Sequence, residues 1–226
     1  MADLLSLTSE QVERESIAQL ERKLGIPEGL FYQLQDESDW SFLIKAQALL
    51  ETALAHLIKT ALGREEILDF LERLNLQGRT GKLELASALG LITKEHKTFL
   101  ELMAGFRNDV AHKIQFVSFD LRAHLQSQSD DEIERFCLKA FALPLSSHLA
   151  MTPERRERIL LNPKGLLWFG AMDFLMVVYN HDQQAELDAL RKVFHESYAT
   201  THNLGLGSLF PSPPSGGLLG PADPPP

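Results

Sequence analysis

The sequence predicts an all-α protein, and three observations support this class. Apolar residues recur at every third or fourth position in at least six separate stretches, which is the spacing of one helix face. Four of these stretches begin at a recognisable helix start. Almost none alternates apolar and polar residues as a half-buried strand would. We expect a single helical domain over residues 1–200 and a separate tail over residues 201–226.

Local signals mark the helices of the N-terminal half. Thr8 and Gln11 have the spacing of a capping box, so a helix is expected from there to about residue 24. The longest apolar periodicity of this half predicts a helix over residues 40–62, which Gly63 ends. Shorter elements are expected at 27–34, 65–74 and 82–91.

The turn expected at residues 77–81 contains two glycines and is followed by Lys82. A phosphate-binding loop needs a Lys followed by Ser or Thr where the helix starts. Here Lys82 is followed by Leu83. The order of residues therefore favours a plain turn, with phosphate binding as the weaker alternative.

Two helix starts mark the region after the middle of the chain. Ser129 and Glu132 form a second capping box, and the helix that follows carries Cys137 on its apolar side. Thr152-Pro153 combines a capping side chain with a proline in the first turn. We expect Cys137 to be a small buried residue in the core.

The last long helix and the segment after it differ sharply in composition. The helix that begins at Asn162-Pro163 is expected to reach about Tyr198. Residues 166–179 are so apolar that they form either a central core helix or a dimer face. In contrast, seven of the last sixteen residues are Pro. Such a segment has too little apolar surface to offset its ordering entropy, so we expect a flexible tail.

Composition limits the classes of function. The formal net charge is -9, which argues against a broad DNA-binding or other nucleic-acid surface. The single Cys137 excludes an intramolecular disulfide, argues against a Cys-based zinc site and is compatible with a reducing compartment. The N-terminus lacks a basic-then-apolar signal pattern, and no uninterrupted apolar run reaches about 18 residues. We expect a cytoplasmic protein with no membrane span, no cofactor and no metal.

One predicted helix, which starts after Thr93, groups several polar residues on the side opposite its apolar stripe. Its core-facing side groups Phe99, Leu102, Met103, Phe106, Val110 and Ile114. The opposite side groups Arg107, Asn108 and His112 with Glu101, and Asp109 adjoins them. Between them lie the small residues Ala104, Gly105 and Ala111. The polar side is either a solvated helix face or a working face that lets a ligand or another backbone approach.

The motif Arg107-Asn108-Asp109-Val110-Ala111-His112 resembles the signature of the HEPN superfamily, whose name stands for higher eukaryotes and prokaryotes nucleotide-binding. That signature is an Arg, often followed by Asn, and then a His near the end of a long helix, with four to six residues between the Arg and the His. Here four residues separate Arg107 from His112. The segments 81–92 and 119–138 around the motif resemble the mannitol operon repressor family, a helical branch of these folds. The likeness covers residues 35–145.

The resemblance implies a HEPN-like helical bundle and two functions. The mannitol repressor-like branch implies a transcription regulator that works through other proteins rather than through direct DNA binding, with nucleotide or RNA as further possible ligands. The alternative is a metal-independent endoribonuclease of toxin or defence type, with a composite site at a homodimer interface. In that case His112 would act as acid or base, Arg107 would hold the phosphate and Asn108 would orient His112 or the substrate. Glu101 would repel phosphate or pair with Arg107.

Helix geometry predicts how the motif residues are placed relative to one another. Arg107 and His112 are about 7.5 Å apart along the axis of a helix. We therefore expect Arg107, Asn108 and His112 to line one polar cleft with Glu101 within reach. Self-association is expected through this helix or through the last long helix, because both offer a close approach or an apolar patch.

Overall fold

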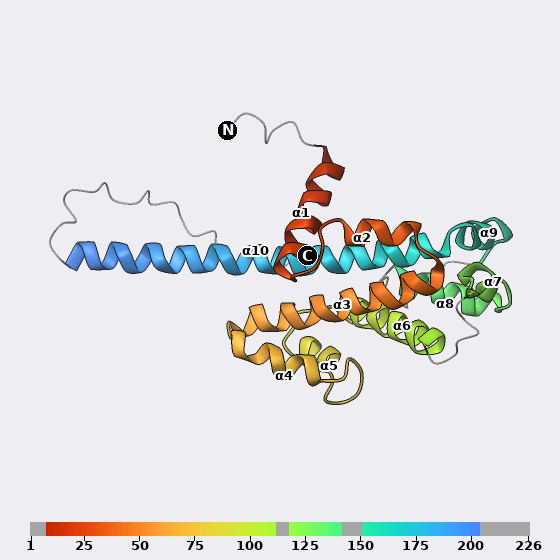
Figure 1. Cartoon of the computed structure of the whole chain (residues 1–226), viewed down its shortest axis with the longest axis horizontal. Coiled ribbons are helices and arrows are strands. Elements are labelled where there is room, and N and C mark those ends of the chain that lie inside the picture. Colours follow the sequence, from red (N-terminus) through yellow and green to blue (C-terminus); the bar gives the residue numbers. More distant parts are fainter. Residues whose placement is uncertain (1–7, 112–117, 142–150, 204–226) are drawn as a thin grey trace, which may run out of the picture. The chain divides into compact units, whose positions relative to one another are not determined.

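The computed structural model describes residues 8–111, 118–141 and 151–203, and side chains up to residue 198. All regular structure in these ranges is helical, which confirms the all-α prediction (Figure 1). The helices longer than one turn are α1 (Ser9–Lys23), α3 (Asp39–Leu62), α4 (Leu68–Arg73), α5 (Lys82–Ala88), α6 (Lys94–Ala111), α7 (Leu121–Gln126), α8 (Asp130–Ala140), α9 (Pro153–Leu161) and α10 (Pro163–Asn203). The short helix α2 (Leu30–Gln33) and two 3-10 turns, Leu34–Asp36 and Glu65–Ile67, connect them.

The predicted helix starts are those of the structure. Thr8 and Ser129 each form a complete capping box, with Gln11 and Glu132 as the residues that bond back to the cap. Thr152 caps α9, and Pro153 is its first residue. These starts depend on residues three positions apart, so the sequence alone suffices to predict them.

Helix α3 lies at the centre of the core and packs against α4, α5 and α6. Phe42, Leu50, Leu54 and Ile58 on α3 are fully buried. The predicted apolar side of α6 is buried as well, at Phe99, Met103, Phe106 and Val110. The indole of Trp40 donates a hydrogen bond to the carbonyl of Val110 over 3.2 Å. This bond fixes the C-terminal end of α6 to the start of α3.

The apolar first half of α10 is a core helix. Leu167, Phe174 and Val178 are fully buried in the same core as α3 and α6. A Cβ atom at Gly170 would clash with the carbonyl of Ala140 and lie 2.6 Å from the ring of Phe99. Burial favours the core interpretation of residues 166–179, whereas self-association stays a prediction.

Helices α7 and α5 differ from the sequence-based expectations. Helix α7 was not expected; Asp120 caps it by accepting a hydrogen bond from the backbone N–H of Ala123 over 2.7 Å. Helix α5 ends at Ala88 rather than near residue 91. The predicted core-facing residue Ile114 of the motif helix lies outside the described residues.

Helix α3 is long and apolar enough by composition to pass a test for membrane spans, unlike any other helix in the described part of the chain. Two thirds of the tested window, 67%, is buried inside the protein. Its apolar side chains are covered by the other core helices, as expected for a central core helix rather than a lipid-facing one. The predicted cytoplasmic location stays a prediction.

Contacts divide the chain into two compact units, Met1–Ala185 and Glu186–Pro226. The described part of the second unit is helical and exposes Leu187, Leu190, Val193 and Phe194, each by 49% or more. The predicted tail lies almost entirely outside the described residues, because they end at residue 203.

Candidate functional site

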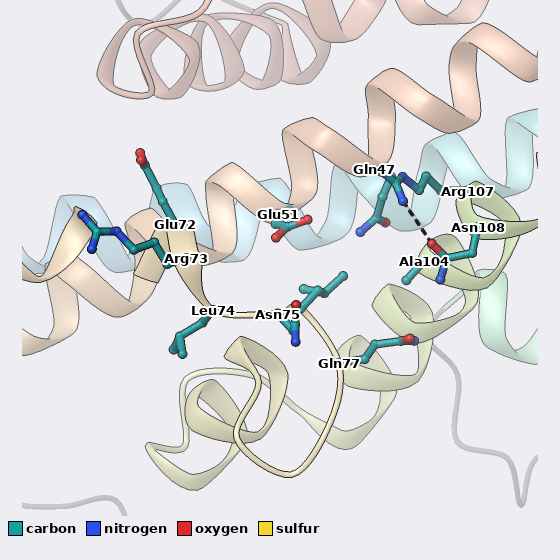
Figure 2. Close-up of a pocket in the computed structure, with 11 residues that line it drawn as sticks. Gln47, Glu51, Glu72, Arg73, Leu74, Asn75, Gln77, Ala104, Arg107 and Asn108 are labelled. Atoms are coloured by element: carbon teal, nitrogen blue, oxygen red, sulfur yellow. Dashed lines mark hydrogen bonds between the residues drawn. The ribbon is translucent and has the colours of Figure 1, made fainter. Parts of the chain in front are cut away.

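A polar cleft of about 470 Å³ opens beside the motif half of α6 (Figure 2). Its volume falls within the range of small-molecule sites, roughly 300–1,000 Å³. Helix α3 forms one wall, and the end of α4 with the loop after it forms another. The cleft is lined by Gln47, Glu51, Glu72, Arg73, Leu74, Asn75, Leu76, Gln77, Ala104, Arg107 and Asn108.

Helix α6 contributes Ala104, Arg107 and Asn108, which share one helix face because they are three and four residues apart. Ala104 is buried, and its small side chain leaves space beside α3. The Arg107 guanidinium donates a hydrogen bond through Nη1 to Oδ1 of Asn108 over 3.1 Å. The two motif residues are therefore bonded to each other where they line the cleft.

The other predicted site residues lie in different places. The Glu101 side chain is exposed and does not line the cleft; its backbone carbonyl accepts a hydrogen bond from Nε2 of Gln77 over 3.4 Å. Asp109 is exposed and does not line it either. His112 lies outside the described residues, so its predicted place in the cleft stays a prediction.

The loop before α5, expected to be a plain turn, supplies a wall of the cleft. The backbone N–H groups of Lys82 and Leu83 donate to the carbonyls of Asn75 and Leu76 over 3.0 and 3.1 Å. A Cβ atom at Gly81 would lie 2.7 Å from the carbonyl oxygen of Gln77, so only glycine fits there. Asn75 and Gln77 of this loop line the cleft together with Arg107.

The cleft carries charges of both signs. Arg73 and Arg107 are positive, and Glu51 and Glu72 are negative. The charge of Glu51 is compensated by the buried Lys82, whose Nζ lies 2.6 Å from Oε1 of Glu51. Lys82 is only 2% exposed, whereas the Glu51 side chain is 37% exposed on the cleft side of the pair. With this pair neutral, Arg73 and Arg107 outnumber the remaining carboxylate.

Arg107 forms no ion pair within the described ranges 8–111, 118–141 and 151–203. The structural alternative, in which Glu101 holds Arg107, therefore finds no support there. An exposed guanidinium with only an amide as its described partner retains most of its five donors for a ligand.

Gln47 on α3 is the polar residue that sequence reasoning missed. It is 4% exposed and lines the cleft, yet its Oε1 atom accepts no hydrogen bond from the described residues. A buried acceptor without a donor costs about 1–3 kcal/mol. The available signal was a lone amide within the apolar stripe of α3, between Leu43 and Leu50. Tertiary packing was needed to place it opposite Arg107.

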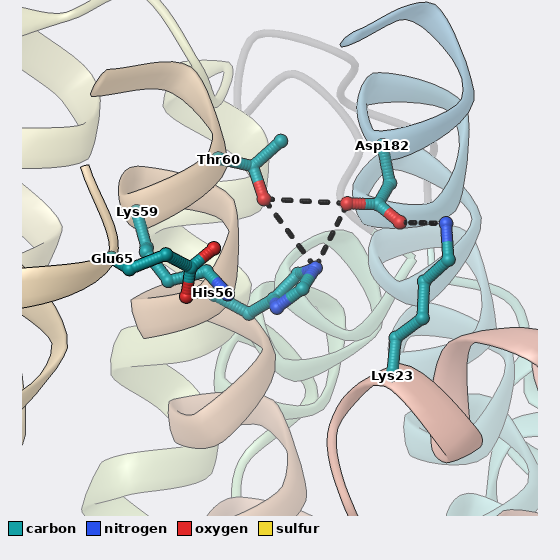
Figure 3. A network of polar contacts seen from close by, with 6 residues as sticks. All are labelled: Lys23, His56, Lys59, Thr60, Glu65 and Asp182. Carbon is teal, nitrogen blue, oxygen red and sulfur yellow. Dashed lines mark hydrogen bonds and ion pairs between the residues drawn. The ribbon is translucent and has the colours of Figure 1, made fainter. Parts of the chain in front are cut away.

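A second polar cluster joins α1, α3 and α10 within the first unit (Figure 3). The Asp182 carboxylate contacts Nε2 of His56 over 2.9 Å through Oδ1 and Nζ of Lys23 through Oδ2. Thr60 donates a further hydrogen bond to Oδ1 over 3.3 Å. Burial raises the pKa of Asp182, but the hydrogen bonds from Lys23 and His56 outweigh it and lower the pKa below its usual value. Both carboxylate oxygens of this buried acid therefore have partners.

A second cavity, of about 390 Å³, lies beside this cluster and is lined by Lys23, His56 and Lys59 among others. It shares Glu51 and Glu72 with the motif cleft. Groups of three or more potential metal ligands are absent from the described residues.

Neither a protein-family model nor a curated protein nor a solved structure matches this chain. Interpretation of the cleft therefore depends on its own residues and geometry.

Proposed function

We propose that this chain is a HEPN-like regulatory module, similar to the mannitol operon repressor family, that binds a nucleotide in the motif cleft. The observation that carries the proposal is Arg107, which lines the cleft and forms no ion pair among the described residues. A guanidinium matches the oxygens of a phosphate group in geometry and charge. Asn108 holds the guanidinium at the cleft mouth.

The remaining lining supports a nucleotide rather than a bare phosphate. Four amide side chains, those of Gln47, Asn75, Gln77 and Asn108, surround the cleft. Amide groups offer a donor and an acceptor side by side, which is the pattern that nucleobase edges present. The chain's net charge of -9 favours a local nucleotide site over a long nucleic-acid surface.

Calorimetric titration with nucleoside monophosphates tests the proposal. Arg107→Gln should weaken binding at least tenfold, because the phosphate loses a charge-assisted, two-pronged contact. Arg135→Gln is the matched control: it removes the same charge from an exposed position on α8. Equal affinities of the wild type and Arg107→Gln would refute the assignment.

An RNA cleavage assay on the wild type and two variants distinguishes the regulatory proposal from the ribonuclease alternative. Under the ribonuclease alternative, the wild type would cut RNA in the presence of EDTA, and both Arg107→Ala and His112→Ala would abolish cutting while the fold survives. Under the regulatory proposal, nucleotides bind and RNA remains intact.

A further inference from the structure

We propose that the exposed apolar stripe of α10 pairs with the same stripe of a second copy of this chain, as a parallel two-stranded coiled coil. The stripe consists of Leu187, Leu190, Val193, Phe194 and Tyr198, whose exposed fractions run from 36% to 67%. All five residues lie in the described part of the second unit, which is a regular helix (Figure 1). The proposal is independent of the nucleotide site, because it uses no residue of the motif cleft.

The spacing of the stripe is that of a coiled-coil seam. Leu187, Leu190 and Phe194 are separated by three and then four residues, so they follow one another along one helix face. In a heptad abcdefg they occupy positions a, d and a, which face the partner helix. Val193 and Tyr198 fall at the flanking g and e positions and widen the stripe. A contiguous row of large apolar side chains is rarely left in water, so it needs a covering surface.

The charges beside the stripe identify a second copy as that surface. Glu186 occupies the g position before Leu187, Arg191 occupies the e position after Leu190, and both are exposed. In a parallel coiled coil, each g residue faces the e residue five positions later on the partner helix. Glu186 therefore faces Arg191 of the second copy, and symmetry repeats this contact on the other side. One heptad later the same rule places Val193 against Tyr198, which continues the apolar seam.

An antiparallel pair fits these charges less well. There the e positions of the two helices face each other, so the register that stacks Leu190 on Phe194 also brings two copies of Arg191 together. Within its own helix, Arg191 donates to Asp188 over 3.2 Å, but these side chains are 68% and 58% exposed. An ion pair that exposed contributes little, so Arg191 is able to turn toward Glu186 of the second copy at low cost.

Analytical ultracentrifugation of the full chain tests the seam. The wild type should form dimers at micromolar concentration. Leu190→Glu should raise the dimer dissociation constant at least about tenfold, because it places a charge in the apolar centre of the interface. Ala189→Glu is the matched control: it adds the same charge at an exposed c position away from the seam and should leave dimers intact.

A charge exchange tests the contact between the two copies. Glu186→Arg alone and Arg191→Glu alone should each weaken the dimer, because each places like charges opposite one another. The variant with both changes should regain the dissociation constant of the wild type. Lys192→Glu, at the outward f position, carries the same charge change as Arg191→Glu and should have little effect. Weakening by the double variant equal to the sum of the single effects would refute the contact.

Disulfide cross-linking tests the orientation. Ser197 occupies the d position after Phe194, so Ser197→Cys should link two copies under mild oxidation when the helices are parallel. The wild type should not be linked, because Cys137 is buried. Dimers of Ser197→Cys without a cross-link would refute the parallel arrangement. A monomeric wild type, or dimers unaffected by Leu190→Glu, would overturn the proposal as a whole and leave nucleotide binding untouched.

Discussion

The motif cleft and the Asp182 cluster both contain buried polar side chains on α3. These side chains differ in whether other residues of the protein form hydrogen bonds or ion pairs with them. In the cluster, His56, Thr60 and Lys23 satisfy both oxygens of Asp182. In the cleft, Gln47 lacks a donor and Arg107 lacks an ion-pair partner among the described residues. Satisfied buried groups hold helices together, whereas unsatisfied ones facing a cavity lower stability until a ligand binds. The comparison separates a polar site whose groups are paired from the proposed binding site within one core.

Breaking the cluster should have the largest effect. Asp182→Asn keeps the shape of the side chain but leaves Lys23 and His56 without their carboxylate, so we expect a loss of about 3 kcal/mol of unfolding free energy. The value lies at the low end for a buried pair because the Lys23 side chain is 29% exposed. Urea denaturation followed by circular dichroism would measure it.

The matched control for that variant is Asp188→Asn, which removes the same charge from an ion pair with Arg191 whose side chains are 58% and 68% exposed. Exposed pairs contribute under about 1 kcal/mol, so this variant should unfold nearly as the wild type does. Equal losses in both variants would remove the distinction between the cluster and the surface.

Acidification should reduce the difference in stability between the wild type and Asp182→Asn. The folded protein lowers the pKa of Asp182, so its carboxylate adds stability above the unfolded pKa of about 3.9. That contribution is lost as the pH falls through the folded pKa. The difference in melting temperature between the wild type and Asp182→Asn should therefore be constant near neutral pH and shrink below about pH 4. A difference that grows on acidification would contradict the assignment.

The smallest effect on stability is expected in the cleft. Arg107→Ala removes an exposed side chain bonded only to Asn108 among the described residues, so the unfolding free energy should change by less than about 0.5 kcal/mol. Thermal melting of this variant beside Asp182→Asn compares the two regions directly. A strong loss of stability would instead place Arg107 in a structural pair, as the alternative with Glu101 requires.

Part of the site was already determined by the sequence. The apolar stripe of α6 fixed which side of that helix is buried, and the remaining side had to carry Arg107 and Asn108. Thr8, Ser129 and Thr152 likewise set the starts of three helices. These features follow from the sequence because they depend on residues within one or two turns, where spacing alone decides which side chains meet.

Only the tertiary structure decided which distant residues meet. Gln47 and Asn75 face α6 because of how α3 and the loop before α5 pack, and Asp182 reaches His56 across 126 positions of the chain. Periodicity favoured a core helix over a dimer face for residues 166–179 but left both open, and burial of Leu167, Phe174 and Val178 supported the core. The physical reason is that helical spacing states which face of a helix is apolar, whereas side-chain packing selects the helix that covers it and the partner of each buried polar group.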